Sequence, residues 1–154
     1  MASDPSEIEA WQRLDERTTT SGFLTPDDIA KLAAIGVCHV INLAPDGRDG
    51  ALEGEAELLA QRAIRYSYIP VPFDAPAQDQ FDEFRQAYDG SDEQVHVHCI
   101  ANYRVSAFFY RYNRDHRDME EAHARSLMEQ QWSPETWDHE LGKVWAQFIA
   151  KGAS

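Results

Sequence analysis

Short apolar runs alternate along the chain with longer stretches in which apolar side chains recur every three or four positions. The runs predict strands and the stretches predict helices. Strands are predicted at 37–43, 66–71 and 94–98, an edge strand or extended lead-in at 18–24, and helices at 25–36, 53–63 and 78–88. Strands that alternate with helices favour an α/β fold, with a mostly parallel sheet of about four to five strands flanked by helices.

The C-terminal part carries only helical patterns. After residue 102, Val105, Phe108, Phe109 and Tyr112 follow the spacing of a helix packed on a core. Asp118 with Glu121 is similar to a capping box. Ser133-Pro134 is predicted to begin a last helix with an apolar stripe, formed by Trp137, Leu141, Val144, Trp145 and Phe148. The tryptophans at 132, 137 and 145 are expected to fill the core there.

Length and charge limit the classes of protein. A chain of 154 residues is expected to form one domain over 1–154, with 1–17 as a loosely ordered lead-in. The net charge of −13 argues against a nucleic-acid partner, because phosphate backbones attract clustered Lys and Arg. No apolar run has the length of a membrane span, and the first residues lack a signal pattern, so we expect a cytoplasmic protein with no membrane partner.

The chain has two cysteines, so no disulfide framework is expected. Cys38 lies in the apolar run 37–43, where a buried, inert thiol is expected. Cys99 lies between a predicted strand and a predicted helix, and Arg104 follows it. The N-terminus of a helix and a nearby arginine favour the thiolate, and with the loop amides they bind oxyanions. A buried structural cysteine is the alternative; the combination favours phosphate-ester chemistry through a cysteine nucleophile.

The loop from His98 to Ser106 resembles the signature of the cysteine-based phosphatases, which is His-Cys, five residues, Arg, then Ser or Thr. Only four residues separate Cys99 from Arg104. This spacing is closer to a bacterial phosphatase-like family related to beta-lactamase-hydrolase-like proteins, whose loop typically reads Cys-Arg-Ser-Gly-Thr-Arg-Ser. Roughly residues 18 to 112 are similar to that family, including Thr20-Ser21-Gly22, the helix opened by Thr25-Pro26, and the segments 40–46, 68–71 and 95–99.

The resemblance implies a tyrosine or dual-specificity type of phosphatase without a cofactor. Cys99 would attack phosphorus, Arg104 would bind the phosphoryl oxygens, and His98 would support the loop through backbone carbonyls. The other predicted loop and support residues are Ile100, Ala101, Asn102, Tyr103 and Ser106. Asn102 replaces the family's central glycine; it tolerates positive φ, and its amide is available to a substrate oxygen. In the superfamily the hydroxyl after the arginine helps the thiolate leave the phosphoenzyme; Ser106 follows Arg104 by two positions instead of one.

Catalysis also needs an acid for the leaving oxygen. Asp74 precedes Cys99 on a loop after a strand, as the general acid does in dual-specificity phosphatases, although an Asp beside prolines also suits a turn. Asp46 and Asp49 are the alternative acids. They follow another strand, and carboxyl ends of parallel strands open on one side of the sheet.

Three alternatives use parts of the same pattern, and the second and third of them stay open. A metal site from His96, His98 and Cys99 has no fourth ligand or recognised spacing, so no metal is predicted. A rhodanese-like sulfurtransferase also places one cysteine in a loop before a helix. A regulatory domain that binds phosphate without turnover is the third. The expected partner is a phosphorylated protein or small molecule, and the oligomeric state is left open.

Overall fold

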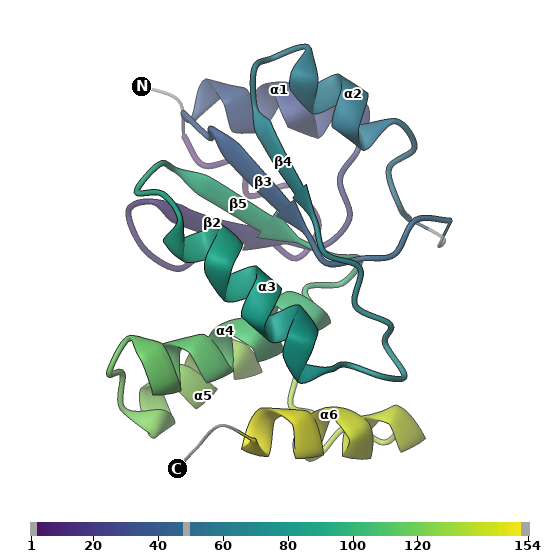
Figure 1. Cartoon of the computed structure of the whole chain (residues 1–154), viewed down its shortest axis with the longest axis vertical. Coiled ribbons are helices and arrows are strands. Elements are labelled where there is room, and N and C mark those ends of the chain that lie inside the picture. Colours follow the sequence, from purple (N-terminus) through teal and green to yellow (C-terminus); the bar gives the residue numbers. More distant parts are fainter. Residues whose placement is uncertain (1–2, 48–49, 152–154) are drawn as a thin grey trace.

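The computed structural model describes residues 3–47 and 50–151 and contains a five-stranded sheet (Figure 1). The strand order is β1-β2-β5-β3-β4. The pairs β2–β5, β5–β3 and β3–β4 are parallel, and β1 is antiparallel to β2. The strands are β1 (Gln12–Arg13), β2 (Thr18–Ser21), β3 (His39–Asn42), β4 (Arg65–Tyr68) and β5 (Val95–His98). The predicted mostly parallel sheet is confirmed.

Helices cover both faces of the sheet. On one face lie α1 (Pro26–Ala34) and α2 (Glu55–Ala60). On the other lie α3 (Gln78–Asp89) and α4 (Tyr103–His116), with α5 (Glu121–Glu129) and α6 (Glu140–Ala150) outside them (Figure 1). Alternation along β3 sends Val40 to the α1–α2 core and Ile41 to the other core. The fold is the expected α/β arrangement with an all-helical C-terminal part.

The segment before residue 18 is part of this fold. Ile8 is buried in the core beneath α1 and α2, and Arg13 forms an ion pair with Asp4. Because β1 pairs with β2, the edge strand is β1, and β2 lies inside the sheet. The predictions of a loosely ordered lead-in and of an edge strand at 18–24 are therefore wrong for the described residues. A two-residue strand is too short to leave a period-two pattern in the sequence.

Three local predictions are also wrong. The last helix begins at Glu140 rather than at Ser133, because residues 133–136 form a turn of their own. Asp118 has a φ of 55° and the N-cap of α5 is Glu120, so Asp118 forms no capping box. Cys38 is exposed: it lies just before β3, and its sulfur contacts the carbonyl of Gly36.

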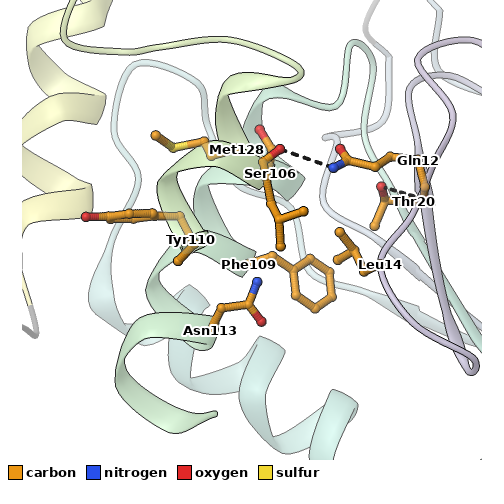
Figure 2. A pocket seen from close by; sticks show the side chains of 10 residues that line it. Gln12, Leu14, Thr20, Ser106, Phe109, Tyr110, Asn113 and Met128 are labelled. Carbon is orange, nitrogen blue, oxygen red and sulfur yellow. Dashed lines mark hydrogen bonds between the residues drawn. The ribbon is translucent and has the colours of Figure 1, made fainter. Parts of the chain in front are cut away.

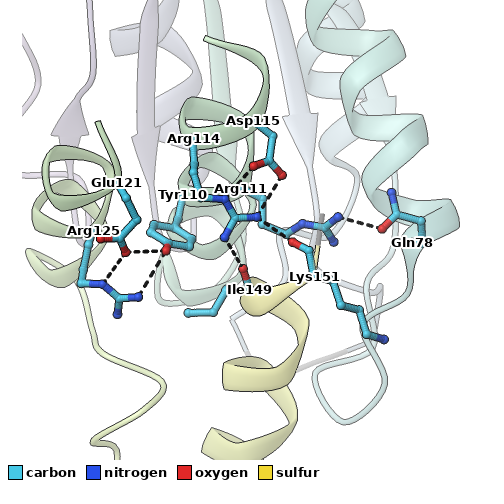
Figure 3. Close-up of polar contacts among 9 residues, drawn as sticks. All are labelled: Gln78, Tyr110, Arg111, Arg114, Asp115, Glu121, Arg125, Ile149 and Lys151. Atoms are coloured by element: carbon cyan, nitrogen blue, oxygen red, sulfur yellow. Dashed lines mark hydrogen bonds and ion pairs between the residues drawn. The ribbon is translucent and has the colours of Figure 1, made fainter. Parts of the chain in front are cut away.

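A polar network joins the C-terminal helices to α4 (Figure 3). Arg125 of α5 bonds Glu121 and the hydroxyl of Tyr110 on α4. Arg114 of α4 donates to the carbonyls of Ile149 and Lys151 at the end of α6. These bonds fix α5 and the end of α6 relative to the helix that follows Cys99.

No helix within residues 3–47 and 50–151 combines the length and the apolarity needed to cross a membrane.

Candidate active site

The loop between β5 and α4 begins where the parallel strands end. Backbone bonds join it to its neighbours: Leu43 donates to the carbonyl of His98 at 2.9 Å, and Phe23 donates to that of Ile100 at 2.9 Å. A Cβ on Gly22 would lie 2.5 Å from the carbonyl oxygen of Ile100. Glycine is therefore required there for the close approach of the two backbones. The loop is therefore held between the segments that follow β2 and β3.

Asn102 makes the tight turn into α4. It has a φ of 66° and a ψ of 8° and is the N-cap of the helix. Its amide donates to the carbonyl of Ala10 at 2.9 Å and to the hydroxyl of Thr20 at 3.1 Å. The predicted positive φ is confirmed. The expected contact of its amide with a substrate oxygen is wrong, because the side chain is fully buried and turned toward the N-terminal segment.

Arg104 presents its guanidinium at the first turn of α4. Its Nε donates to the carbonyl of Val71 at 2.8 Å, and its Cζ lies 5.1 Å from the centre of the Phe73 ring. The side chain is 5% exposed, so the bond to Val71 sets the plane of the guanidinium in a largely dry setting. A guanidinium fixed in this way is suited to bidentate binding of an oxyanion.

A cleft of about 510 Å³ opens beside this guanidinium. Among the described residues, Arg104 is the one charged residue of its lining. The full lining is Gly47, Phe73, Ile100, Ala101, Tyr103, Arg104 and Trp137. Four of the predicted loop residues, Ile100, Ala101, Tyr103 and Arg104, therefore meet at one cleft.

Cys99 is a free cysteine with no exposed surface. Its backbone amide lies 3.4 Å from the carbonyl of Ser21, and its side chain belongs to the core on the α4 side of the sheet. The residues that follow it, rather than Cys99 itself, line the cleft. The thiol is thus covered in this structure, while the arginine is at the surface of the cleft.

His98 is held by a carboxylate that the sequence pattern did not indicate. Its Nε2 lies 2.6 Å from Oε2 of Glu55, and both side chains are buried. Its Nδ1 lies 3.2 Å from the carbonyl oxygen of Cys99, which agrees with the expected bond to a backbone carbonyl. Both partner atoms are hydrogen-bond acceptors, and they hold the ring through its two nitrogens. Glu55 was missed because it reads as one of several acids on a short surface helix.

His96 lies on the same face of β5 and is fully buried. Its ring nitrogens face the hydroxyls of Thr19 and Ser21, each at 2.8 Å, and its ring stacks on Trp11. Burial holds the pKa of His96 well below its usual range, which keeps the ring neutral. Its two ring nitrogens are therefore engaged in the sheet. Within the described residues, no group of three or more His, Cys, Asp or Glu side chains is placed to hold a metal ion.

Ser106 is not brought to the cleft. Its hydroxyl donates to the carbonyl of Tyr103 at 3.2 Å. The side chain faces a separate small cavity between α4, α5 and the N-terminal strands, beside Gln12, Thr20 and Met128 (Figure 2). The extra residue between Arg104 and Ser106 turns the hydroxyl around α4, away from the position expected for a partner of Cys99.

The acids expected to serve the leaving group lie near the cleft without lining it. Asp74 is exposed and directly follows Phe73, on the connection between β4 and α3. Asp46 is exposed beside Gly47 and lines a neighbouring groove, and its backbone amide donates to the hydroxyl of Tyr68 at 2.7 Å. Asp49, the other alternative, lies outside the described residues.

Trp137 was expected in the core and lies instead at the cleft. It is half-buried, on the connection between α5 and α6. Trp132 and Trp145 are buried as predicted. The sequence did not show that Trp137 differs from the other two, because the prediction placed it in the last helix. In the structure the turn at 133–136 comes first, and Trp137 lies before that helix.

The comparison with protein families settles the relationship. Residues 11–111 match the family described as beta-lactamase hydrolase-like protein, phosphatase-like domain. The chain belongs to this family. The match spans the sheet, the loop at Cys99 and most of α4, and it ends before α5. A search of curated proteins finds no match.

Solved structures of the cysteine-based phosphatase superfamily have the same fold. A phosphatase candidate of the DUF442 group from Shewanella putrefaciens CN-32 is 28% identical, with a TM-score of 0.77, over 97% of this chain and 96% of that one. TpbA from P. aeruginosa, solved with pTyr, is 18% identical, with a TM-score of 0.67, over 99% and 96%. The catalytic core of the PP-IP phosphatase SIW14 from S. cerevisiae is 10% identical, with a TM-score of 0.75, over 94% and 85%. These matches establish a phosphatase-like fold.

Proposed function

We propose that the protein is a cysteine-dependent phosphomonoester hydrolase of the tyrosine or dual-specificity type. The observation that carries this proposal is the cleft beside the loop of Cys99, with Arg104 as the one charged residue of its described lining. A guanidinium oriented by its bond to the carbonyl of Val71, at the N-terminus of a long helix, is suited to a phosphoryl group. Membership of a phosphatase-like family supports the same reaction.

In the proposed reaction, the Cys99 thiolate forms a bond to phosphorus while the bond from phosphorus to the ester oxygen breaks. Asp74 gives its proton to that leaving oxygen. Water then attacks the cysteinyl phosphate, the sulfur–phosphorus bond breaks, and inorganic phosphate leaves. Arg104 and the loop amides stabilise the charge on the three phosphoryl oxygens in both steps. The steps use no metal or organic cofactor.

A reducing compartment suits this chemistry, because the nucleophile must stay a free thiol. Both cysteines of the chain are free in the structure. We therefore place the protein in the cytoplasm as part of the proposal.

Phosphate binding without turnover is the second candidate. Two observations favour it: Cys99 has no exposed surface, and the Ser106 hydroxyl is bonded to Tyr103 instead of facing the thiol. Such a domain would bind oxyanions at Arg104 and hydrolyse nothing.

Phosphate release from phenyl phosphate distinguishes the two candidates. A hydrolase releases phosphate, and Cys99→Ser abolishes the release while inorganic phosphate still binds. Arg104→Lys loses the planar donor pair, so phosphate binding weakens about tenfold or more. Hydrolysis that survives Cys99→Ser contradicts the cysteine mechanism, and phosphate binding without hydrolysis by the unmodified protein assigns the second function.

A further inference from the structure

Among the described residues, the cleft is lined by one charged group and three aromatic side chains. Phe73, Tyr103 and Trp137 line it together with Arg104. The Trp137 ring meets those of Phe73 and Tyr103 edge-on, with centroids 5.9 Å and 5.7 Å away. All three aromatic residues are half-buried, so part of each remains available to a ligand.

Two buried tryptophans fix the first two walls. The indole N–H of Trp132 donates to the carbonyl of Tyr103 at 3.0 Å, and the two rings stack at 4.4 Å with parallel planes. The indole N–H of Trp145 donates to the carbonyl of Phe73 at 2.7 Å, and these rings lie 5.4 Å apart. These two aromatic walls are thus held by hydrogen bonds from indole side chains of the C-terminal part to their backbone carbonyls.

Trp137 is fixed in a different way. Its amide donates to the carbonyl of Ser133 at 3.0 Å, which closes the turn before α6. A Cβ on Gly142 would lie 2.8 Å from the carbonyl oxygen of Pro134 and 3.0 Å from that of Trp137. Because residue 142 is glycine, α6 packs directly on this turn and sets the place of the Trp137 ring. The ring of His139 stacks on it at 4.5 Å.

This lining matches a phosphate attached to a flat ring. Aromatic side chains gain from edge-to-face and offset contacts with another ring. A sugar or polyol phosphate would need several hydrogen-bonding groups for its hydroxyls. Beyond the Arg104 guanidinium, the described lining side chains offer only the Tyr103 hydroxyl and the Trp137 indole N–H. We propose that Trp137 is a specificity-determining residue that selects phosphate esters with an aromatic leaving group. This inference rests on the proposed phosphatase function and names its substrate class.

The inference concerns a part of the chain that the family match does not reach. Residues 11–111 supply Phe73, Tyr103 and Arg104, whereas Trp132, Trp137 and Trp145 come from beyond the match. Arg104 and two of the aromatic walls therefore lie within the matched residues, whereas the third wall, Trp137, lies beyond them and can be changed without altering Arg104.

The test compares phenyl phosphate with glycerol 2-phosphate in the wild type, Trp137→Ala and Trp137→Phe. We expect Trp137→Ala to lower kcat/KM for phenyl phosphate about tenfold and to leave the value for glycerol phosphate unchanged, since one aromatic contact contributes up to about 1.5 kcal/mol. Trp137→Phe keeps a ring and is expected to retain most of the preference. An equal loss for both substrates in Trp137→Ala, or a wild type that prefers glycerol phosphate, overturns the inference.

Binding separates a failure of this inference from a failure of the proposed function. In Cys99→Ser protein, phenyl phosphate should bind more tightly than inorganic phosphate, and the added Trp137→Ala change should remove that difference. This outcome without any turnover by the wild type supports the aromatic selection and rejects the hydrolase. Equal binding of the two ligands to Cys99→Ser protein overturns the selection, whatever the turnover. Thermal unfolding of each variant shows that the protein is folded.

Discussion

The carboxylate of Glu55 lies 2.6 Å from Nε2 of His98, and both side chains are buried between α2 and the sheet. His98 directly precedes Cys99, and its Nδ1 faces the carbonyl of Cys99. A residue of α2 is thereby connected to the start of the loop that we propose binds the phosphoryl group. Glu55 acts through His98 and is a positioning residue in this account.

Glu55→Gln tests that connection. The amide keeps the shape of the side chain but loses its charge, and a buried hydrogen bond to a charged group contributes about 1.5–3 kcal/mol. We expect the free energy of unfolding to fall by about 2 kcal/mol and kcat to fall more than KM rises. Glu57→Gln is the matched control, because Glu57 is an exposed acid on the same helix. If the two variants have equal stability and equal kcat, Glu55 does not position His98.

Gly22→Ala tests the clamp on the loop. The added Cβ meets the Ile100 carbonyl oxygen at 2.5 Å and the Ala101 Cα at 3.3 Å, so the loop backbone must shift. A shift of about 1 Å at a positioned group can cost about a hundredfold in rate. We expect weaker phosphate binding by titration and a loss of turnover of that order. Gly90→Ala, at the end of α3, is the remote control; a Gly22→Ala protein that binds phosphate as the control does contradicts the clamp.

His96 predicts how stability changes with pH. Its pKa in the folded protein is well below the ordinary value of 6.5 because the ring is buried. Below pH 6.5 the unfolded chain binds a proton on this histidine that the folded protein does not bind. The contribution of His96 to stability is therefore fully present above pH 6.5 and is lost as the pH falls toward the pKa of the folded protein. We expect a loss of up to about 1.4 kcal/mol per pH unit below the ordinary value.

Denaturant unfolding between about pH 5.5 and 7.5 measures this slope. His39, whose pKa burial also lowers, contributes to it in the same direction. His39→Gln should therefore keep the part of the slope that belongs to His96, and His96→Gln should lose it. A slope that is unchanged in His96→Gln shows that His96 does not cause it.

Asp74→Asn tests the general acid. Phenyl phosphate needs a proton on its leaving oxygen, whereas para-nitrophenyl phosphate has a leaving group that is stable as an anion. We expect kcat for phenyl phosphate to fall by about 10²–10⁴-fold and that for para-nitrophenyl phosphate to change much less. Asp46→Asn is the matched comparison, since Asp46 is also exposed and lies beside Gly47 of the cleft. If Asp46→Asn shows the selective loss instead, Asp46 is the acid.

The sheet and the place of the loop could be predicted because each depends on local sequence. Apolar runs define β3 and β5, and the Thr25-Pro26 start defines α1, which carries a capping box closed by Asp28. The place of Arg104 in the first turn of α4 could be predicted because Cys99 directly follows a strand and a helix begins shortly after it. The positive φ of Asn102 was also predictable, because few other residues tolerate it.

Contacts between distant residues could not be predicted in this way. The Asn102 amide bonds Ala10, ninety-two positions away in the sequence, and so turns inward instead of toward a ligand. Glu55 contacts His98 because one face of the short helix α2 packs against the sheet, and Trp137 lines the cleft because the turn before α6 faces it. The sequence alone does not reveal these two placements, because the same residue patterns also occur around exposed acids and around tryptophans of the core.

The central claim is that Cys99 becomes phosphorylated during turnover, and a rapid acid quench followed by mass spectrometry of the Cys99 peptide tests it most directly. Because the Ser106 hydroxyl is bonded to the Tyr103 carbonyl, it is not placed to help the sulfur leave, and the intermediate should accumulate. The account predicts one added phosphoryl group on that peptide during hydrolysis of phenyl phosphate, absent in Cys99→Ser. Phosphate release with Cys99 unmodified at every quench time would contradict it.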